Sequence, residues 1–100
     1  MHNHTYNEDM EFTWDEAKRR ANIINHGFDF VDAKNVFEGF TFTLEDDRFD
    51  YGEERFITIG LLKGMVVVIA HTEKGNEVRV ISIRKATKHE QKIYFEGLTD

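Results

Sequence analysis

Residues 55–84 read RFITIGLLKGMVVVIAHTEKGNEVRVISIR, and this stretch decides the fold. Its apolar and β-branched residues fall into three runs typical of strands, at 55–62, 65–72 and 77–84. Lys63-Gly64 separates the first two runs and Lys74-Gly75-Asn76 the last two. Such short links containing glycine are typical of β-hairpins. The stretch therefore predicts three antiparallel strands that follow one another as a meander.

The last of these runs alternates, which places its side chains on two faces. Strict alternation puts Arg79, Ile81 and Ile83 on one face, and Val80, Ser82 and Arg84 on the other. N-terminal to the meander, residues 40–44 alternate in the same way and predict a fourth strand. An acidic loop at residues 45–54 joins this strand to the meander.

Two helices are predicted before the sheet. The first spans residues 14–25, with Thr13 as N-cap, Glu16 completing a capping box, and Gly27 ending the helix. Apolar residues at helical spacing predict one buried stripe: Trp14, Ala17, Ala21 and Ile24. A second, shorter helix is predicted at residues 29–37 and ends at Gly39.

A capping box of Thr87 and Glu90 predicts a last helix that runs to about residue 96. The predicted fold class is α+β, with two N-terminal helices, a four-stranded antiparallel sheet and a short C-terminal helix. The predicted order is α-α-β-β-β-β-α.

Composition excludes several classes of protein. The chain has 100 residues and no cysteine, which rules out disulfides, zinc–thiolate sites and thiol catalysis. Its longest apolar run is too short to cross a membrane, and no signal peptide is recognisable at the start. We therefore expect a cytoplasmic protein with no membrane partner.

Charge is divided along the chain although the total is −6. Residues 1–54 hold 5 Lys/Arg and 14 Asp/Glu, whereas residues 55–94 hold 8 Lys/Arg and 3 Asp/Glu. This division indicates two faces with different partners, or two halves that neutralise each other in the fold. The basic half is where an anionic partner would bind.

Arg84 is the first candidate for chemistry, because it stands just before the predicted helix start at Thr87. A guanidinium beside free helical N–H groups suits a phosphate. The competing interpretation is a solvated basic helix with Arg84 paired to a carboxylate. Glu54 and Arg55 form a second candidate pair at the start of a strand, and His26 is a candidate acid/base group at a helix end. The acidic loop is either solvated or a weak cation site.

Three ordered motifs resemble the BrnT family of toxins from type II toxin–antitoxin pairs. They are W-D-x-x-K…N-x-x-x-H-G at residues 14–27, E-x-R at 53–55, and R-x-I-S-x-R-x-A-T-x-x-E-x-x-x-Y at 79–94. The resemblance covers about residues 11–94. It departs from the family at Asn25, where lysine is usual, and at Ile83, where a small residue is usual.

The resemblance implies a RelE-like fold for residues 11–97 as a single BrnT-like toxin domain, with a flexible leader at residues 1–10. It implies a metal-independent endoribonuclease without cofactors that inhibits translation. Its implied partners are an RNA substrate and a ribbon-helix-helix antitoxin resembling BrnA, with operator DNA bound only through that antitoxin. The alternative is a catalytically weak or inert module that acts mainly as corepressor.

The implied site residues are the matched basic positions and their neighbours: Arg84, Arg55, His26, Glu54, Lys85 and Tyr94. In this interpretation the two arginines stabilise charge on the phosphate. His26 or Glu54 acts as base, and Lys85 or Tyr94 as acid.

Overall fold

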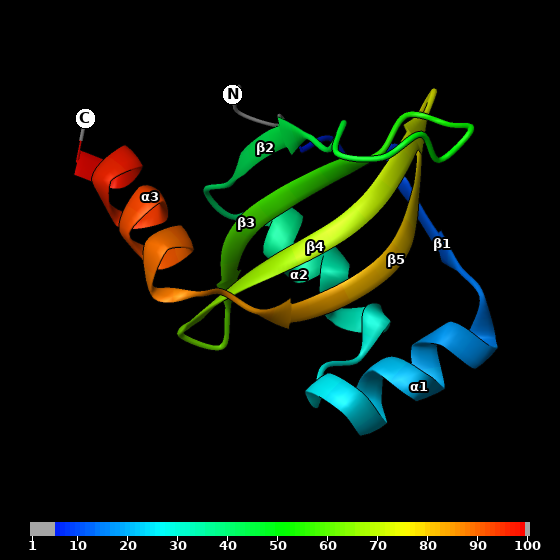
Figure 1. Cartoon of the computed structure of the whole chain (residues 1–100), viewed down its shortest axis with the longest axis horizontal. Coiled ribbons are helices and arrows are strands. Elements are labelled where there is room, and N and C mark those ends of the chain that lie inside the picture. The colour runs from blue at the N-terminus through cyan, green and yellow to red at the C-terminus, as the bar shows by residue number, and fades with distance from the viewer. Residues whose placement is uncertain (1–5, 100) are drawn as a thin grey trace.

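A computed structural model describes residues 6–99. Figure 1 shows the order of their elements along the chain. The order is β1 (Glu11–Trp14), α1 (Glu16–His26), the 3-10 helix η1 (Phe30–Asp32), α2 (Ala33–Glu38), β2 (Phe42–Glu45), β3 (Phe56–Leu62), β4 (Met65–Lys74), β5 (Glu77–Lys85) and α3 (Lys88–Thr99). The fold class is α+β, and the predicted second helix is η1 followed directly by α2.

The predicted element order is wrong in one respect, because a strand precedes the first helix. The described residues form a mixed five-stranded sheet in the order β1-β5-β4-β3-β2. Strand β1 lies parallel to β5, with Glu11 opposite Glu77 and Trp14 opposite Val80. The observed order is β-α-α-β-β-β-β-α, and the sheet is not the predicted four antiparallel strands.

The meander itself is as predicted. Strands β3, β4 and β5 pair antiparallel in sequence order, and β2 adds antiparallel to β3. Lys63 and Gly64 have φ values of 52° and 80° in the β3–β4 turn. Positive φ at both central residues of a two-residue turn matches the right-handed twist of the flanking strands, which fixes the hairpin register.

A β-bulge corrects the predicted facing of β5. Ala70 lies opposite Ser82, but its neighbour His71 lies opposite Val80, so Ile81 is an extra residue in β5. Alternation is therefore interrupted. The register leaves Arg79, Ser82 and Arg84 on one face of the sheet, while Ile83 joins the buried core on the other.

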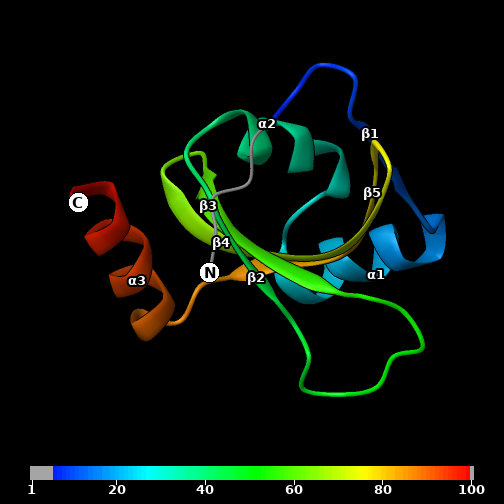
Figure 2. The ribbon, with the colours of Figure 1, turned by 90° about the horizontal axis from the view of Figure 1, so that it is seen from above.

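Helices α2 and α3 lie on opposite faces of the sheet, as Figure 2 shows from above, and each face has its own core. The α2 side holds the larger core of Phe30, Ala33, Val36, Phe37, Leu62, Val67, Ile69, Val78, Val80 and Ile83. Tyr6 and Met10 pack against it. They belong to the predicted leader, whose first five residues lie outside the described chain. The α3 side holds Phe42, Ile59, Val66, Val68, Ala86 and Tyr94.

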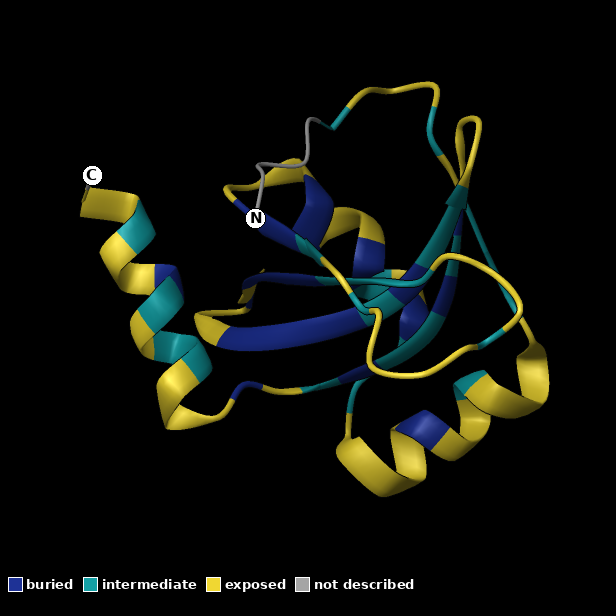
Figure 3. Cartoon of the chain, turned by 45° about the horizontal axis from the view of Figure 1, so that its top comes forward, coloured by how far each residue is buried: buried dark blue, intermediate teal, exposed yellow. Residues whose placement is uncertain are grey.

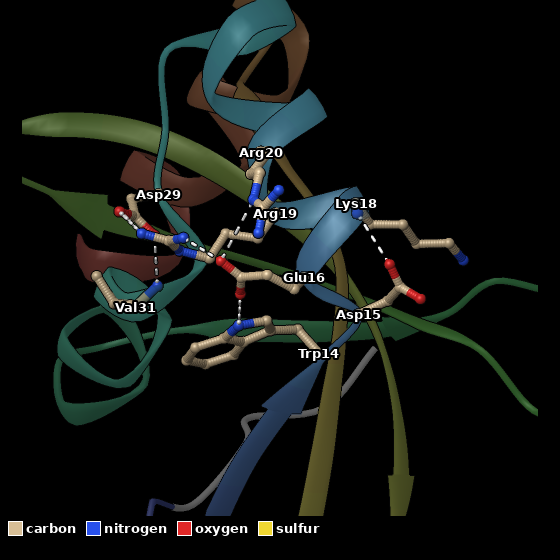
Figure 4. Close-up of polar contacts among 8 residues, drawn as sticks. All are labelled: Trp14, Asp15, Glu16, Lys18, Arg19, Arg20, Asp29 and Val31. Carbon is tan, nitrogen blue, oxygen red and sulfur yellow. Dashed lines mark hydrogen bonds and ion pairs between the residues drawn. The ribbon is translucent and has the colours of Figure 1, made fainter.

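Helix α1 begins two residues later than predicted. Thr13 belongs to β1, and Asp15 is the N-cap, because its side chain accepts the backbone N–H of Lys18 at 3.0 Å. Figure 4 shows the polar contacts around this start, where Glu16 accepts from the Trp14 indole at 3.3 Å. Gly27 ends the helix as predicted, with φ at 77°.

The predicted apolar stripe of α1 is not buried. Ala17, Ala21 and Ile24 are exposed, and Figure 3 shows the helix as mostly exposed with one buried position. That position is Asn22, whose amide donates to the Ile83 carbonyl at 2.9 Å and accepts the Ile83 N–H at 3.1 Å. The amide takes the place of a neighbouring strand where β1 has ended. The helix therefore covers a sheet edge through a polar side chain.

Arg19 fixes α1 to the segment that follows it. Its guanidinium donates to both carboxylate oxygens of Asp29, at 2.8 and 3.1 Å, as Figure 4 shows. Asp29 in turn accepts the Val31 N–H at 3.1 Å and so caps η1. These hydrogen bonds, that from Arg19 above all, lower the pKa of Asp29. One carboxylate thus joins two helices.

Candidate functional site

Helix α3 covers only one end of its face of the sheet. Beyond it, a row of cross-strand partners remains partly exposed, with Leu44 opposite Ile57, Ile57 opposite Ala70, and Ala70 opposite Ser82. We call this row and the polar side chains around it the open face. Arg84 and Arg79 stand on the same face of β5, on either side of Ser82.

Arg84 is held at the edge of the open face by Glu90. Its Nη1 and Nη2 atoms donate to the two carboxylate oxygens at 2.8 and 2.9 Å, and Nη1 also donates to the Lys85 carbonyl at 3.3 Å. The side chain is 39% exposed. Within the described residues, the Nε–H and one Nη2–H keep no partner, and these two donors lie on one edge of the planar guanidinium. Such an edge matches two oxygens of a phosphate.

Glu90 also occupies the helix start that the sequence indicated as an anion site. Its carboxylate accepts the Thr87 N–H at 2.8 Å, and the Thr87 hydroxyl accepts the Glu90 N–H at 3.2 Å, so the predicted capping box is confirmed. The hydrogen bond from Arg84 is the main cause that lowers the pKa of Glu90 to about 2. The carboxylate is therefore ionised at neutral pH and fixes the Arg84 side chain.

Arg48 is a second cation near Arg84 that sequence reasoning missed. It comes from the acidic loop and donates to both oxygens of Asp46 at 2.8 and 3.1 Å. Hydrogen bonding to Glu90 raises the pKa of Arg84, while the positive charge of Arg48 acts to lower it. Like charges held near one another are stabilised by an anion between them. The sequence feature that could have indicated Arg48 is its position as the single arginine among the carboxylates of the acidic loop.

Asp46 anchors the loop that carries Arg48. Its backbone N–H donates to the Arg55 carbonyl at 2.7 Å and closes the loop at its base. Its side chain, 8% exposed, also accepts the Tyr51 hydroxyl at 3.3 Å. Asp46 therefore accepts hydrogen bonds from Arg48 and Tyr51, and these bonds compete with any metal ion for its oxygens.

Arg55 and Arg79 share one carboxylate at the other end of the open face. Glu53 accepts from Arg79 at 2.7 Å and from Arg55 at 3.4 Å. The Arg55 guanidinium also stacks over the Tyr51 ring, 4.1 Å from its centroid. Arg79 is a second residue that sequence reasoning did not select, although it lies in the third quoted motif.

Arg55 and Arg84 do not meet at one point. Arg84 lies opposite Val68, and Val68 lies opposite Ile59, which is four residues beyond Arg55 in β3. At strand spacing this is about 13 Å along the sheet, across two strands. The two arginines therefore suit different phosphates of one chain.

The other predicted site residues are dispersed. His26 is exposed on the helix face that Asn22 uses to contact Ile83, one turn or about 6 Å further along α1. Figure 1 shows α1 beside β5. Lys85 is exposed and follows Arg84 directly. Tyr94 is 1% exposed in the α3-side core, and its hydroxyl donates to the Phe40 carbonyl at 2.9 Å.

Glu54 lies in acidic surroundings rather than beside Arg84. It lines a cavity of about 510 Å³ together with Glu53, Thr72, Glu73, Lys74, Glu77 and Arg79. Within the described residues no group of three or more His, Cys, Asp or Glu side chains is placed to hold a metal ion. No helix of that part of the chain is long and apolar enough to cross a membrane.

Fold and site together define a small α+β protein whose open sheet face presents arginine side chains held by carboxylates. Comparison with known families identifies the family within this class. The sequence model of BrnT, the ribonuclease toxin of type II toxin–antitoxin systems, matches residues 14–90, and the chain belongs to this family. Family membership implies an RNA target and an antitoxin partner. No curated protein matches the chain.

Proposed function

We propose that this toxin is a metal-independent endoribonuclease whose scissile phosphate binds at Arg84. The observation that carries the proposal is the Nε–Nη2 edge of Arg84, which has no partner among residues 6–99 and is held in place by Glu90. Arg48, whose Nε and Nη2 atoms donate to Asp46, adds a positive charge at longer range. Both cations stabilise the negative charge that develops on the phosphate oxygens during the reaction.

RNA supplies its own nucleophile in this mechanism. The 2′-oxygen attacks the adjacent phosphorus, the bond from phosphorus to the 5′-oxygen breaks, and the proton of the 2′-hydroxyl passes to a base. His26 is the proposed base, because it is exposed on the α1 face that contacts β5 next to Arg84. Lys85 is the proposed donor to the 5′-oxygen. The products are a 2′,3′-cyclic phosphate and a 5′-hydroxyl.

Three further residues receive supporting roles. Arg55 and Arg79 bind phosphates on one side of the scissile one, since both lie at the other end of the open face and share Glu53. Tyr94 supports the fold rather than the chemistry, because its hydroxyl is used in the core. Glu54 is not placed in the reaction.

End-group analysis of the cleaved RNA tests this function. Purified toxin is incubated with a synthetic RNA in excess EDTA, and the product ends are identified by mass spectrometry. We expect undiminished cleavage with 2′,3′-cyclic phosphate and 5′-hydroxyl ends. Abolition of cleavage by EDTA, or products with 5′-phosphate ends, would contradict the proposal.

We further propose that the antitoxin is a ribbon-helix-helix protein and that operator DNA binds only through it. The family match supports an antitoxin partner, and the resemblance of the sequence motifs to the BrnT family supports this type of antitoxin. Purified toxin alone should leave operator DNA unshifted in a gel, whereas the complex should shift it. A shift by the toxin alone would contradict this proposal.

Expression of the toxin alone separates the enzyme from a corepressor. We expect wild-type toxin to act in the cytoplasm, where it inhibits translation and so arrests bacterial growth. Arg84→Ala should permit growth. Equal growth with both proteins at equal abundance would favour the inert corepressor.

A further inference from the structure

A second cavity opens between the β3–β4 hairpin and α3. It has a volume of about 280 Å³, and its lining is Lys63, Gly64, Met65, Val66, Lys85, Gln91 and Phe95. The hairpin turn and the first turns of α3 lie side by side in Figures 1 and 3. A cavity of this size admits a single nucleobase with part of its sugar.

The lining has the side chains that bind an unpaired nucleotide. Phe95 is 49% exposed and offers an aromatic face, and Met65, 41% exposed, offers a second apolar surface. Gln91 donates through its amide to the Ala86 carbonyl at 3.2 Å, which leaves its side-chain oxygen to accept from a base edge. Lys63 and Lys85 supply positive charge for a phosphate.

Charge distinguishes this cavity from the acidic one. No carboxylate lines it, whereas Glu53, Glu54, Glu73 and Glu77 line the other. Of the two cavities, only the basic one attracts a phosphodiester. Lys85 also connects it to the proposed catalytic arginine, because Lys85 follows Arg84 in β5.

We infer that this cavity is a nucleotide subsite that binds an unpaired RNA base next to the scissile phosphate, with Phe95 stacking on the base and Gln91 contacting its edge. The inference rests on the proposed position of that phosphate at Arg84. Phe95 and Gln91 are then residues that determine which nucleotide flanks the cleaved bond. Proteins usually recognise single-stranded RNA by stacking its unpaired bases on aromatic side chains.

Binding of a non-cleavable RNA tests the subsite. The probe is a fluorescein-labelled oligoadenylate with 2′-O-methyl groups, which lacks the attacking hydroxyl, and binding is measured by fluorescence anisotropy. Phe95→Ala should weaken binding about five-fold or more, as expected for loss of one base stack. The matched control is Leu98→Ala, since Leu98 is 46% exposed on the same helix and does not line the cavity, and it should bind like wild type.

Two further comparisons make the test specific. Phe95→Leu preserves apolar bulk and should still weaken binding, which separates loss of stacking from a change in fold. Lys63→Ala should lower the slope of log affinity against log salt by about 0.7, whereas Lys34→Ala on α2 should leave it unchanged. Thermal melts confirm that each variant is folded.

Equal affinity of Phe95→Ala and Leu98→Ala would overturn the subsite. So would a Phe95→Ala toxin that binds RNA normally but no longer assembles with its antitoxin, since the cavity would then belong to the antitoxin. These outcomes are independent of the proposed function. Cleavage that depends on Arg84 can persist while the subsite fails, and binding through Phe95 can persist while Arg84 proves dispensable.

Discussion

At the scale of single residues, two carboxylates decide what the arginines can do. Glu90 holds Arg84 by the Nη1–Nη2 end of its guanidinium, whereas Asp46 holds Arg48 by the Nε–Nη2 side edge. The sequence motif predicted Arg84 as a site residue, and the ion pair to a carboxylate was its competing interpretation. The ion pair is compatible with the proposed site, because it uses the end of the guanidinium and leaves the side edge for a ligand.

Glu90 should make stability depend on acid pH. Its pKa falls from an ordinary 4.5 to about 2 on folding, so its contribution is complete above about pH 4.5 and is lost as the pH falls towards 2. Glu90→Gln should lower the free energy of unfolding by about 1–2 kcal/mol at neutral pH. Urea unfolding of both proteins, at neutral pH and near pH 2, should show this difference shrink at the acid end. A difference that stays constant with pH would contradict the prediction.

Asn22 should protect the edge of β5. Asn22→Ala leaves the N–H and C=O of Ile83 without their partners, which should cost about 2 kcal/mol and speed hydrogen exchange of the Ile83 amide. Asn22→Asp keeps only the acceptor, so it should destabilise the fold while the Ile83 amide stays protected. Asn25→Ala, exposed on the same helix, is the control. Unchanged exchange at Ile83 in Asn22→Ala would refute this role.

At the scale of elements, local signals predicted the hairpin, the end of α1 at Gly27 and the capping box of α3. They failed where distant contacts decide the structure. Strand β1 has four residues and pairs with β5, and no turn sequence between them marks a parallel pairing. The prediction of a buried apolar stripe on α1 was wrong because the helix contacts the sheet through Asn22. A search for apolar residues at helical spacing does not detect a polar contact.

The packing of α3 depends on a glycine. A Cβ added at Gly97 would lie 1.7 Å from the Phe42 ring, whereas one at Gly39 would meet only a backbone oxygen at 3.7 Å. Alanine usually favours a helix interior, yet Gly97→Ala should destabilise the protein by about 1–3 kcal/mol because the ring must shift. Gly39→Ala should be nearly neutral. Thermal or urea unfolding of both variants tests this, and equal stability would contradict the packing.

At the scale of the whole molecule, the charge division of the sequence becomes a division of surfaces. Carboxylates gather around the cavity at the β4–β5 turn, while the cavity beside α3 has lysines and no carboxylate. Composition alone could not show this, because some acidic side chains neutralise arginines of the open face and others do not. Glu53 belongs to the first kind, since it binds Arg55 and Arg79.

RNA affinity should therefore fall steeply with salt. Each phosphate contact adds about 0.7 to the slope of log affinity against log salt for a single strand. Arg55→Ala and Arg79→Ala should each reduce the slope by about that amount, and Arg20→Ala on the exposed side of α1 should not. Anisotropy titrations of the 2′-O-methyl probe at several salt concentrations give the slope. Identical slopes for all four proteins would place the RNA elsewhere.

The rate of RNA cleavage under single-turnover conditions tests the central claim, that Arg84 holds the scissile phosphate. Arg84→Lys keeps a positive charge beside Glu90 but lacks the two-donor edge, and Arg20→Ala serves as control. We predict that Arg84→Ala and Arg84→Lys lower the rate about 100-fold or more while both remain folded, and that Arg20→Ala cleaves like wild type. A folded Arg84→Ala toxin that cleaves RNA at the wild-type rate would contradict the account.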